Sequence, residues 1–221
     1  MGFLRAVSRN FIGLIFPSRC LICGRSIDPL RSSPLCVEHV RELIPVEPPV
    51  CSKCGRKMFG KSVESLVCAK CRSKKVYHDA GYSTFIYAKA LRELIHLFKY
   101  RKRRYLRSFL GGLILDYLRE HADMSEYDII VPVPLHWWRY CSRGFNQAAD
   151  LARPLSGHFR IPIVKRSLRR VRYTRPQVGL TPEERKSNIR NAFKVVRPAK
   201  VADKRLLLID DVITSGATLN E

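Results

Sequence analysis

The chain alternates between uninterrupted apolar runs and segments whose apolar residues recur at helical spacing. Apolar runs at 128–134, 161–165 and 206–209 predict short strands, and the first and last are typical of strands buried on both faces of a parallel sheet. Segments 88–100 and 109–118 predict helices, the first of them amphipathic. This alternation predicts an α/β domain, doubly wound around a mostly parallel sheet.

Capping residues predict where further helices begin and end. Asn146 is expected to cap a helix that runs to Ser156, with Gly157 just beyond its end. The sequence TPEE at 181–184 forms a capping box with proline at the first helical position, so another helix starts there. Segment 193–196 is expected to be a strand that leads into the final apolar run.

The N-terminal residues 1–18 predict a short amphipathic helix that ends at Pro17. We expect its apolar face to pack on the rest of the protein rather than on a membrane. The apolar run from Phe11 to Phe16 is too short for a membrane span or a signal peptide. Residues 76–87 are rich in aromatic and β-branched side chains and predict a strand or hairpin.

A cysteine motif occurs twice between these segments. CLICGR begins at Cys20 and CSKCGR at Cys51, and after gaps of twelve and thirteen residues each continues to a second pair, spaced C-x-x-H or C-x-x-C. Four such ligands are what a closed, structural zinc site requires. Ribbons this small hold no core of their own, so the metal supplies much of their folding energy. The predicted ligands of two structural Zn²⁺ ions are Cys20, Cys23, Cys36 and His39, and Cys51, Cys54, Cys68 and Cys71.

The spacing leaves two alternatives open. His39 is either the fourth ligand or an unrelated surface histidine, and the knuckles could pair between the two units instead of within them. Cysteine pairs at zinc spacing argue against a secreted disulfide framework, so we expect a cytoplasmic protein. Cys141 has no partner at such a spacing and is expected to be a free thiol.

The net charge of the chain indicates which kinds of molecule it binds. Among 221 residues, 41 Lys and Arg face 19 Asp and Glu, and the net charge of +22 favours nucleic acid or phosphorylated small molecules. Basic residues concentrate in 92–107 and 165–190. Lys99 to Arg107 interleaves them with Tyr100 and Tyr105, a pattern that suits single-stranded nucleic acid. A solvated helix end, where cations relieve the helix dipole, explains the same pattern equally well.

The residues that follow the last apolar run, 206–209, are candidates for ligand binding. Asp210 and Asp211 follow it, and then a loop of small, hydroxyl-bearing residues at 214–218. At the carboxyl edge of a sheet, such a loop can close its backbone N–H groups on a phosphate. The two acids suit a vicinal sugar diol, or a metal held through water. Together they predict a site for a ribose 5-phosphate unit; the alternative is an ordinary strand capped by a turn.

The stretch DDVITSGAT closely resembles the phosphoribosyl pyrophosphate (PRPP) motif of type I phosphoribosyltransferases. The resemblance implies that Asp210 and Asp211 are the catalytic acids, which contact the ribose hydroxyls of PRPP bound with Mg²⁺. It also implies that the loop behind them cradles the 5-phosphate, through Val212, Ile213, Thr214, Ser215, Gly216, Ala217 and Thr218.

A second resemblance runs from about Cys20 to the last residue. VPVP at 131–134, then Arg139, then RGFNQA at 143–148, behind a double C-x-x-C ribbon, look like the ComF family, the competence-associated branch of phosphoribosyltransferase-like proteins. The resemblance implies that 133–143 lies where the pyrophosphate loop lies, and that the basic segment 169–180 is a mobile hood loop. The residues that it implies are Arg139, Arg143 and Gly144 in the pyrophosphate loop and Arg175 and Gln177 in the hood loop.

The family places a helix and a last strand after the phosphate loop, but only LNE at 219–221 follows here, so the domain is expected to be truncated. The expected domains are a helix at 1–18, a double zinc ribbon at 19–75 and a phosphoribosyltransferase-like domain at 76–221. The expected function is binding of PRPP or a related ribose phosphate, linked to DNA uptake, with pyrophosphate displaced at the anomeric carbon if the protein is catalytic. The alternative is a module without transferase activity that binds single-stranded DNA or docks a DNA-uptake helicase.

Overall fold

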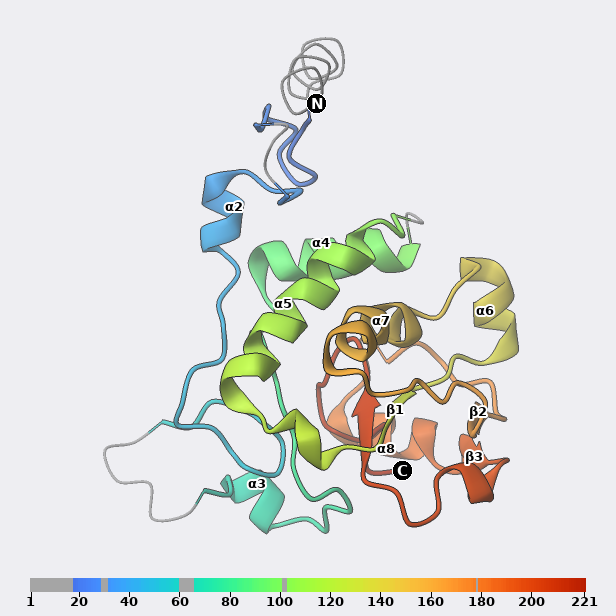
Figure 1. The fold of residues 1–221 in the computed structure, drawn as a ribbon. Helices are drawn as coiled ribbons and strands as arrows, with labels where there is room; N and C mark the ends of the chain where they lie inside the picture. Colours follow the sequence, from blue (N-terminus) through green and yellow to red (C-terminus); the bar gives the residue numbers. More distant parts are fainter. Residues whose placement is uncertain (1–17, 29–31, 60–65, 101–102, 178) are drawn as a thin grey trace. The chain divides into compact units, whose positions relative to one another are not determined.

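The computed structural model describes the chain outside residues 1–17, 29–31, 60–65, 101–102 and 178 (Figure 1). The predicted N-terminal helix therefore lies outside the described residues, apart from Ser18. Contacts divide the chain into two compact units, Met1–Ile44 with Phe85–Phe109 and Pro45–Thr84 with Leu110–Glu221. The first cysteine motif belongs to one unit and the second to the other.

The first unit contains α2 (Val37–Arg41), α4 (Lys89–Tyr100) and the start of α5 (Leu106–His121). Helix α4 confirms the predicted amphipathic helix, because Leu94, Ile95 and Phe98 are buried along one face. Helix α5 confirms the second predicted helix and is longer than expected at both ends, crossing from one unit into the other.

The second unit is organised around a small parallel sheet. Strands β1 (Ile129–Pro132) and β4 (Leu206–Ile209) pair in parallel. On the other edge of β1, Ile163 forms an isolated parallel bridge with Ile130, and the N–H of Ile130 donates to Pro162 O at 2.9 Å. The predicted α/β class with parallel strands is thus confirmed, while the third predicted strand is reduced to one bridge.

Burial differs between the two paired strands. All four residues of β1 are buried, as predicted. The prediction that β4 is buried on both faces is wrong: Leu207 and Ile209 are buried, but Leu206 is 41% exposed. Among the described residues β4 pairs along one edge only, so it lies at the margin of the sheet, where one face has less cover.

Helix α7 (Gln147–Phe159) packs across β1 and β4. The predicted cap is confirmed, because Asn146 Oδ1 accepts the N–H of Ala149 at 3.4 Å. The predicted end is wrong: the helix continues through Gly157, and the chain turns at Arg160, whose φ of 58° is left-handed. A glycine weakens a helix without ending it, and here the turn lies three residues later than the composition suggests.

The predicted pyrophosphate loop is partly helical. Trp137–Arg143 forms α6, which Gly144 ends with a φ of 78° and an N–H that donates to Tyr140 O at 2.7 Å. Arg139 and Arg143 therefore lie on a short helix and not on an open loop. In Figure 1, α6 lies near β2 and β3 of the same unit.

Two further predictions concern the basic segment. Strand β2 (Leu168–Arg170) pairs antiparallel with β3 (Phe193–Val195), which confirms a strand at 193–196 but shows that the expected hood loop begins inside a strand. Helix α8 (Pro182–Ile189) has the predicted capping box: Thr181 N–H donates to Glu184 Oε2 at 2.7 Å and Glu184 N–H to Thr181 Oγ1 at 3.3 Å.

The remaining elements are short: α3 (Ala69–Arg72), η1 (Met124–Glu126) and η2 (Pro198–Lys200). The predicted strand or hairpin at 76–87 is wrong, since this segment forms no named strand and has a single bridge residue, Phe85. Instead, its residues bond to the chain between the two ribbon motifs and to the second motif itself, as in the 3.0 Å hydrogen bonds from Val46 N–H to Thr84 O and from Gly81 N–H to Ser52 O. Among the described residues no helix has both the length and the apolar character that crossing a bilayer requires.

Candidate functional site

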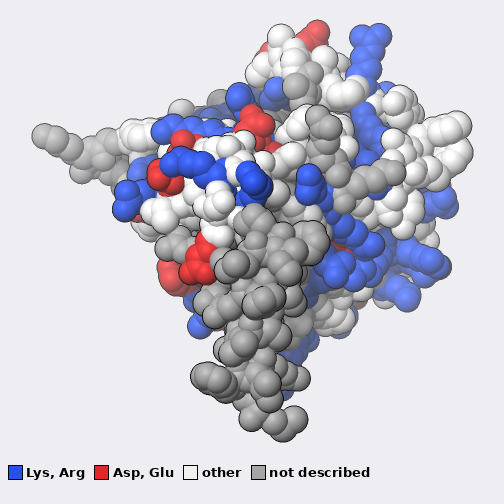
Figure 2. Space-filling model, turned by 90° about the horizontal axis from the view of Figure 1, so that it is seen from above, with Lys and Arg blue, Asp and Glu red and all other residues white. Residues whose placement is uncertain are grey.

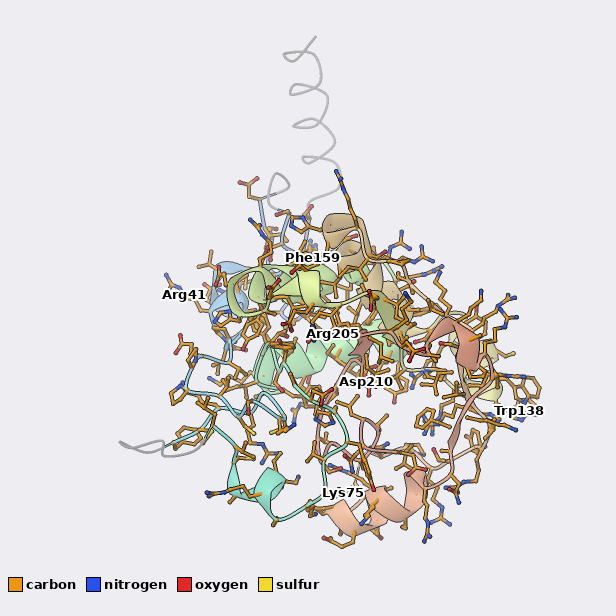
Figure 3. The ribbon with its side chains drawn as sticks, turned by 60° about the horizontal axis from the view of Figure 1, so that its bottom comes forward. Arg41, Lys75, Trp138, Phe159, Arg205 and Asp210 are labelled. Carbon is orange, nitrogen blue, oxygen red and sulfur yellow. The ribbon has the colours of Figure 1, made fainter. Side chains whose placement is uncertain are left out.

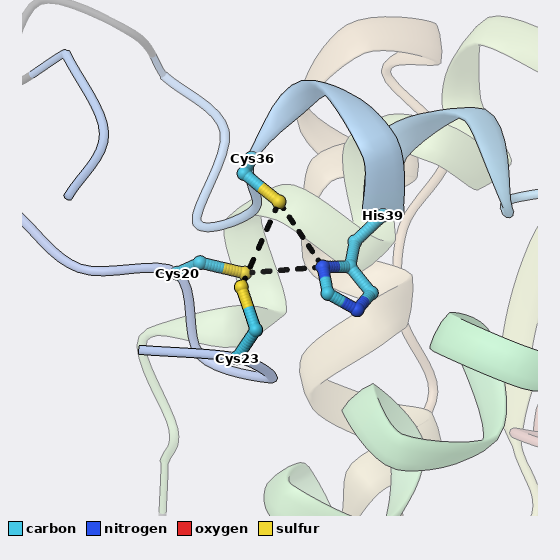
Figure 4. Close-up of side chains that lie close together, drawn as sticks. All are labelled: Cys20, Cys23, Cys36 and His39. Atoms are coloured by element: carbon cyan, nitrogen blue, oxygen red, sulfur yellow. Dashed lines mark hydrogen bonds between the residues drawn. The ribbon is translucent and has the colours of Figure 1, made fainter. Parts of the chain in front are cut away.

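The first cysteine motif brings its four predicted ligands to one point (Figure 4). His39 Nδ1 lies 3.1 Å from Cys36 Sγ and 3.5 Å from Cys20 Sγ, and the Sγ atoms of Cys23 and Cys36 lie 3.9 Å apart. Tetrahedral zinc with Zn–S bonds of about 2.3 Å separates two sulfurs by about 3.8 Å. The four groups therefore fit a zinc ion, and His39 belongs to the set.

The second motif repeats this arrangement with four sulfurs. Cys51, Cys54, Cys68 and Cys71 lie within 4.8 Å of one another, and Cys54 Sγ is 3.9 Å from Cys68 Sγ. In both motifs the second ligand pair begins at the N-cap of a short helix, α2 or α3. The knuckles thus pair within each motif, which excludes the interleaved alternative.

Hydrogen bonds prepare one thiol in each motif for a metal. The guanidinium of Arg25 donates to Cys23 Sγ at 3.4 Å and lowers the pKa of that thiol to about 6. Burial raises the pKa of the Cys51 thiol, but backbone donors outweigh it, including the Cys68 N–H at 3.3 Å, and the pKa falls to about 6. Thiolates are the form that binds zinc, so Cys23 and Cys51 are the thiols that favour the metal-binding state. Burial raises the pKa of Cys54 and Cys71, so zinc binding would have to displace the protons of those thiols.

The eight cysteines are all free thiols, and the seven in the two motifs are the predicted zinc ligands. Cys141, on the exposed surface of α6, takes part in neither motif, as predicted.

The predicted phosphate loop follows β4 directly. Asp210 and Asp211 are half-buried at the carboxyl end of the strand, and the Asp211 N–H donates to Asp210 Oδ1 at 2.9 Å. Gly216 has a φ of 76°, which favours glycine, and a Cβ atom there would meet nothing within 4 Å. Thr214 is exposed and the loop residues Val212, Ile213, Ser215, Ala217 and Thr218 are half-buried, so other chain segments do not bury this turn.

The predicted hood residues lie differently. Gln177 reaches the phosphate loop, because its Nε2 donates to Thr218 Oγ1 at 3.1 Å. Arg175 is tied by its backbone to Asn188, whose side chain accepts from Arg175 N–H at 3.1 Å and donates to Arg175 O at 3.0 Å. The hood segment is therefore anchored to both the loop and α8.

The predicted pyrophosphate residues are held by specific hydrogen bonds. Arg139 Nη2 donates to Thr174 O at 2.7 Å, and Arg143 Nη1 donates to Gln147 Oε1 at 3.0 Å. Gly144 is the left-handed C-cap that ends α6 after Arg143. Arg139 and Arg143 thus form a pair of cations on α6. Hydrogen bonds to the buried residues Thr174 and Gln147 fix the direction of the two guanidinium groups.

Arg170, on β2, is a site residue that the sequence did not single out. Its guanidinium donates to Thr174 Oγ1, so Arg170 and Arg139 converge on one buried residue. Burial, and then repulsion by Arg139, lower the pKa of Arg170 to about 10, while the carboxylate of Asp210 opposes that shift. Arg170 therefore lies within electrostatic reach of Arg139, a predicted pyrophosphate residue, and of Asp210, a predicted diol residue. The pairing of β2 with β3 brings it there, and the sequence alone does not reveal that pairing.

Arg170 also has an unused donor. Its buried Nε has no hydrogen-bond partner among the described residues. Crowded guanidiniums with a spare N–H are suited to a multiply charged anion such as a phosphate. The carboxylates of Asp210 and Asp211 are hard oxygen donors, which fit Mg²⁺ beside such an anion.

Comparison with known proteins places the chain in a family. The family model described as the double zinc ribbon domain matches residues 11–74. Competence protein F of Haemophilus influenzae is 30% identical over 210 residues, 93% of this chain and 89% of that protein. DNA utilization protein YhgH of Salmonella typhimurium is 30% identical over 94% of this chain and 90% of its own length.

A more distant relative and the solved structures complete the comparison. Competence protein ComFC of Streptococcus pneumoniae is 23% identical over 91% of this chain and 90% of its own length. No solved structure matches the chain. With two closed zinc ligand sets ahead of an α/β domain, and with relatives that align along nearly its whole length, the chain belongs to the ComF family of competence-associated proteins.

Proposed function

We propose that the carboxyl end of β4 binds PRPP or a related ribose phosphate together with Mg²⁺, in a cytoplasmic protein that serves DNA uptake. The names of the relatives, Competence protein F and DNA utilization protein, support the biological context. Eight free thiols, seven of them in metal ligand sets, support a reducing compartment.

One arrangement supports the proposal: Arg139 and Arg170 converge on Thr174, and Gln177, in the same segment, bonds to Thr218 of the loop that follows Asp210 and Asp211. A ribose phosphate with a pyrophosphate group needs hydrogen-bond acceptors for its diol and cations for its anionic end, separated by one sugar ring. The acids after β4 supply the acceptors, and Arg139, Arg143 and Arg170 supply the cations. The loop at 214–218, which is exposed at Thr214 and half-buried elsewhere, would close on the remaining phosphate with its backbone N–H groups, of which that of Ala217 donates to Ser215 Oγ at 3.4 Å.

The same groups would support transfer chemistry. An acceptor's lone pair forms a bond to the anomeric carbon while the carbon–oxygen bond to pyrophosphate breaks, and the bonding electrons leave with the pyrophosphate. Arg139, Arg143 and Arg170 would stabilise the charge that develops on this leaving group, since fixed cations act strongly in a partly buried site. Bound Mg²⁺ would neutralise part of the pyrophosphate charge.

The test is a matched set of Asp→Asn variants in calorimetric titrations with PRPP and Mg²⁺. Asp210→Asn and Asp211→Asn are expected to abolish binding because each removes a negative charge and replaces one of the two acceptor oxygens with an NH2 donor. Asp203→Asn is the control: Asp203 is exposed, and its φ of 54° is one that asparagine also adopts. Affinity that is unchanged in the first two variants would refute the assignment of the acids.

A second candidate function is binding of single-stranded nucleic acid at Lys99 to Arg107. Tyr100 is 53% exposed and Tyr105 is 54% exposed, so both rings are accessible to bases, although residues 101–102 lie outside the description. Affinity for a single strand should fall steeply with salt and drop when Lys99, Arg103 and Arg104 are changed to Gln. A flat salt response would remove this candidate. Docking of a DNA-uptake helicase remains a prediction that rests on family resemblance.

A further inference from the structure

Helix α6 exposes an unusual amount of aromatic surface. Trp137 is 57% exposed and Trp138 is 59% exposed, and their rings stack with centroids 4.1 Å apart and planes 26° apart. Tyr140, on the same short helix, is 52% exposed. Large aromatic side chains grouped on a surface mark a place where something binds, because a solitary exposed ring is ordinary but a cluster is not.

Arginines lie among these rings. Arg139 follows Trp138 directly, and its guanidinium lies 5.5 Å from the ring centre of Tyr173, which is itself 56% exposed. His136 contacts the same tyrosine edge-on at 5.4 Å. Tyr173 thereby extends the aromatic surface from α6 onto the segment after β2, with a guanidinium between the two.

The two segments that carry this surface have charged residues of one sign. Residues 133–149, which include α6, contain no Asp or Glu, and neither do residues 165–182, which carry Tyr173. Arg172 and Arg175 are exposed beside Tyr173. Figure 2 shows more Lys and Arg than Asp and Glu on the face that it presents. The occupant of such a surface is therefore an anion that also offers flat apolar faces.

We propose that Trp137, Trp138, Tyr140 and Tyr173 form a stacking surface for the bases of a single-stranded nucleic acid, whose phosphates pair with the neighbouring arginines. Unpaired bases expose the faces that these rings require, whereas a duplex already stacks its bases on one another. Trp, Tyr and Arg also anchor protein–protein interfaces, so an acidic protein is the alternative occupant, and unchanged oligo(dT) binding in a variant without the tryptophans would favour it. The inference rests on the nucleic-acid candidate above and adds a contact on α6 to the one at 99–107.

The surface adjoins the proposed ribose phosphate site without coinciding with it. In Figure 3, Trp138 lies at the outer margin of the ribbon and Asp210 lies further in. Arg139 takes part in both, since it is on α6 and also bonds to Thr174 beside Arg170. The two proposals stay separable because the ribose phosphate site is tested at Asp210 and Asp211, and the aromatic surface is tested with oligo(dT) at the tryptophans.

The test uses the chain's own fluorescence, because Trp137 and Trp138 are its two tryptophans. An oligo(dT) strand should quench their emission as it binds, since a stacked base contacts the indole directly. An oligonucleotide of equal length with abasic sugars keeps the phosphates, and it should bind about tenfold more weakly and leave the emission unchanged. The same oligo(dT) in a duplex should also fail to quench.

Two variants distinguish the contribution of ring stacking to oligo(dT) binding from the contributions of charge and of apolar surface area. Trp137→Leu with Trp138→Leu keeps an apolar surface but removes the rings, and should weaken oligo(dT) binding about tenfold or more by fluorescence anisotropy of a labelled strand. Tyr77→Ala is the matched control, because Tyr77 is also exposed (68%) and also has a cation, Lys75 Nζ, 5.0 Å from its ring centre. Its affinity should match that of the wild type.

Each of these measurements has a result that would overturn a proposal. The α6 surface would be overturned if oligo(dT) bound the Leu variant with full affinity and did not quench the wild type. In that case, loss of binding on neutralising Lys99, Arg103 and Arg104 would assign the contact to 99–107. Absence of oligo(dT) binding would overturn both nucleic-acid proposals. In either case the PRPP titration of the Asp variants still tests the ribose phosphate site on its own.

Discussion

Arg56, in the second zinc ribbon, donates a 3.4 Å hydrogen bond to the carbonyl oxygen of Thr214 in the predicted phosphate loop. The contact joins residues that are 158 positions apart within one unit. The side chain of Asn220, just after the loop, adds a second connection, because it accepts from Tyr77 N–H at 2.9 Å and donates to Lys75 O at 3.0 Å. The second ribbon and the chain that follows it therefore hold the candidate phosphate loop by hydrogen bonds.

The knuckle that carries Arg56 is itself packed tightly. A Cβ atom on Gly55 would lie 2.3 Å from the backbone nitrogen of Ser83, and Ser83 Oγ donates to Cys54 O at 3.1 Å. A Cβ atom on Gly24, the equivalent glycine of the first ribbon, would meet nothing within 4 Å. Only the second zinc is thus expected to influence the phosphate loop.

Zinc loss from the two ribbons should have different consequences for the site. Cys54→Ser removes a ligand from the second centre, loosens the knuckle that holds Arg56, and should lower PRPP affinity about tenfold. Cys23→Ser does the same to the first centre and should leave PRPP affinity unchanged. Elemental analysis confirms the loss of one zinc in each variant, and calorimetry measures the affinity. Equal affinities in the two variants would contradict the link through Arg56.

His39 should behave as a metal ligand and be replaceable by cysteine. His39→Ala removes one of four ligands, so elemental analysis should fall from two zinc ions per chain to one. His39→Cys copies the second ribbon, where Cys71 occupies the matching position, and should keep both ions. Two retained ions in the Ala variant would show that His39 is not needed.

Adjacent glycines of α5 should respond in opposite directions to alanine. A Cβ atom on Gly111 would lie 2.7 Å from Pro154 Cγ in α7, whose ring cannot move aside, so Gly111→Ala should destabilise the second unit by about 1–3 kcal/mol. Gly112 has open space around it, and Gly112→Ala should stabilise the helix by about 0.5–1 kcal/mol. Urea unfolding of both variants measures the difference; destabilisation of equal size would argue against this close packing of α5 on α7.

The capping box of α8 should make stability depend on pH. The hydrogen bond from Thr181 N–H lowers the pKa of Glu184 in the folded protein. As the pH falls, the unfolded chain therefore takes up a proton first, so the contribution of Glu184 is complete above its unfolded pKa of about 4.3 and is lost as the pH falls through the folded pKa. Glu184→Gln keeps the hydrogen bond without the charge. The difference in urea midpoint between wild type and variant should shrink across that range; a constant difference would contradict this role.

The zinc ligands were predictable because spacing along the chain determines them. Cys20 and Cys23 lie on one tight turn, and any pair at that spacing presents two sulfurs to one ion. The local capping signals at Asn146 and Thr181 were predictable for the same reason, since each depends on residues no more than three positions away.

Features that depend on distant contacts were not predictable. Arg170 becomes part of the candidate site only because β2 pairs with β3 and turns its side chain toward Thr174. The exposure of Leu206 reflects which strands flank β4, and an apolar run alone cannot report that. The exposure of the tryptophans of α6 likewise depends on what packs against that helix, which the sequence does not report.

The most direct test of the proposed ribose phosphate site is a calorimetric titration of the wild-type protein with PRPP, with and without Mg²⁺, alongside ribose 5-phosphate. The arrangement of Asp210, Asp211 and the three arginines predicts saturable binding of PRPP that requires Mg²⁺, and weaker binding of ribose 5-phosphate, which lacks the pyrophosphate that the arginines would hold. Absence of PRPP binding at any Mg²⁺ concentration, or equal affinity for the two ligands, would contradict it.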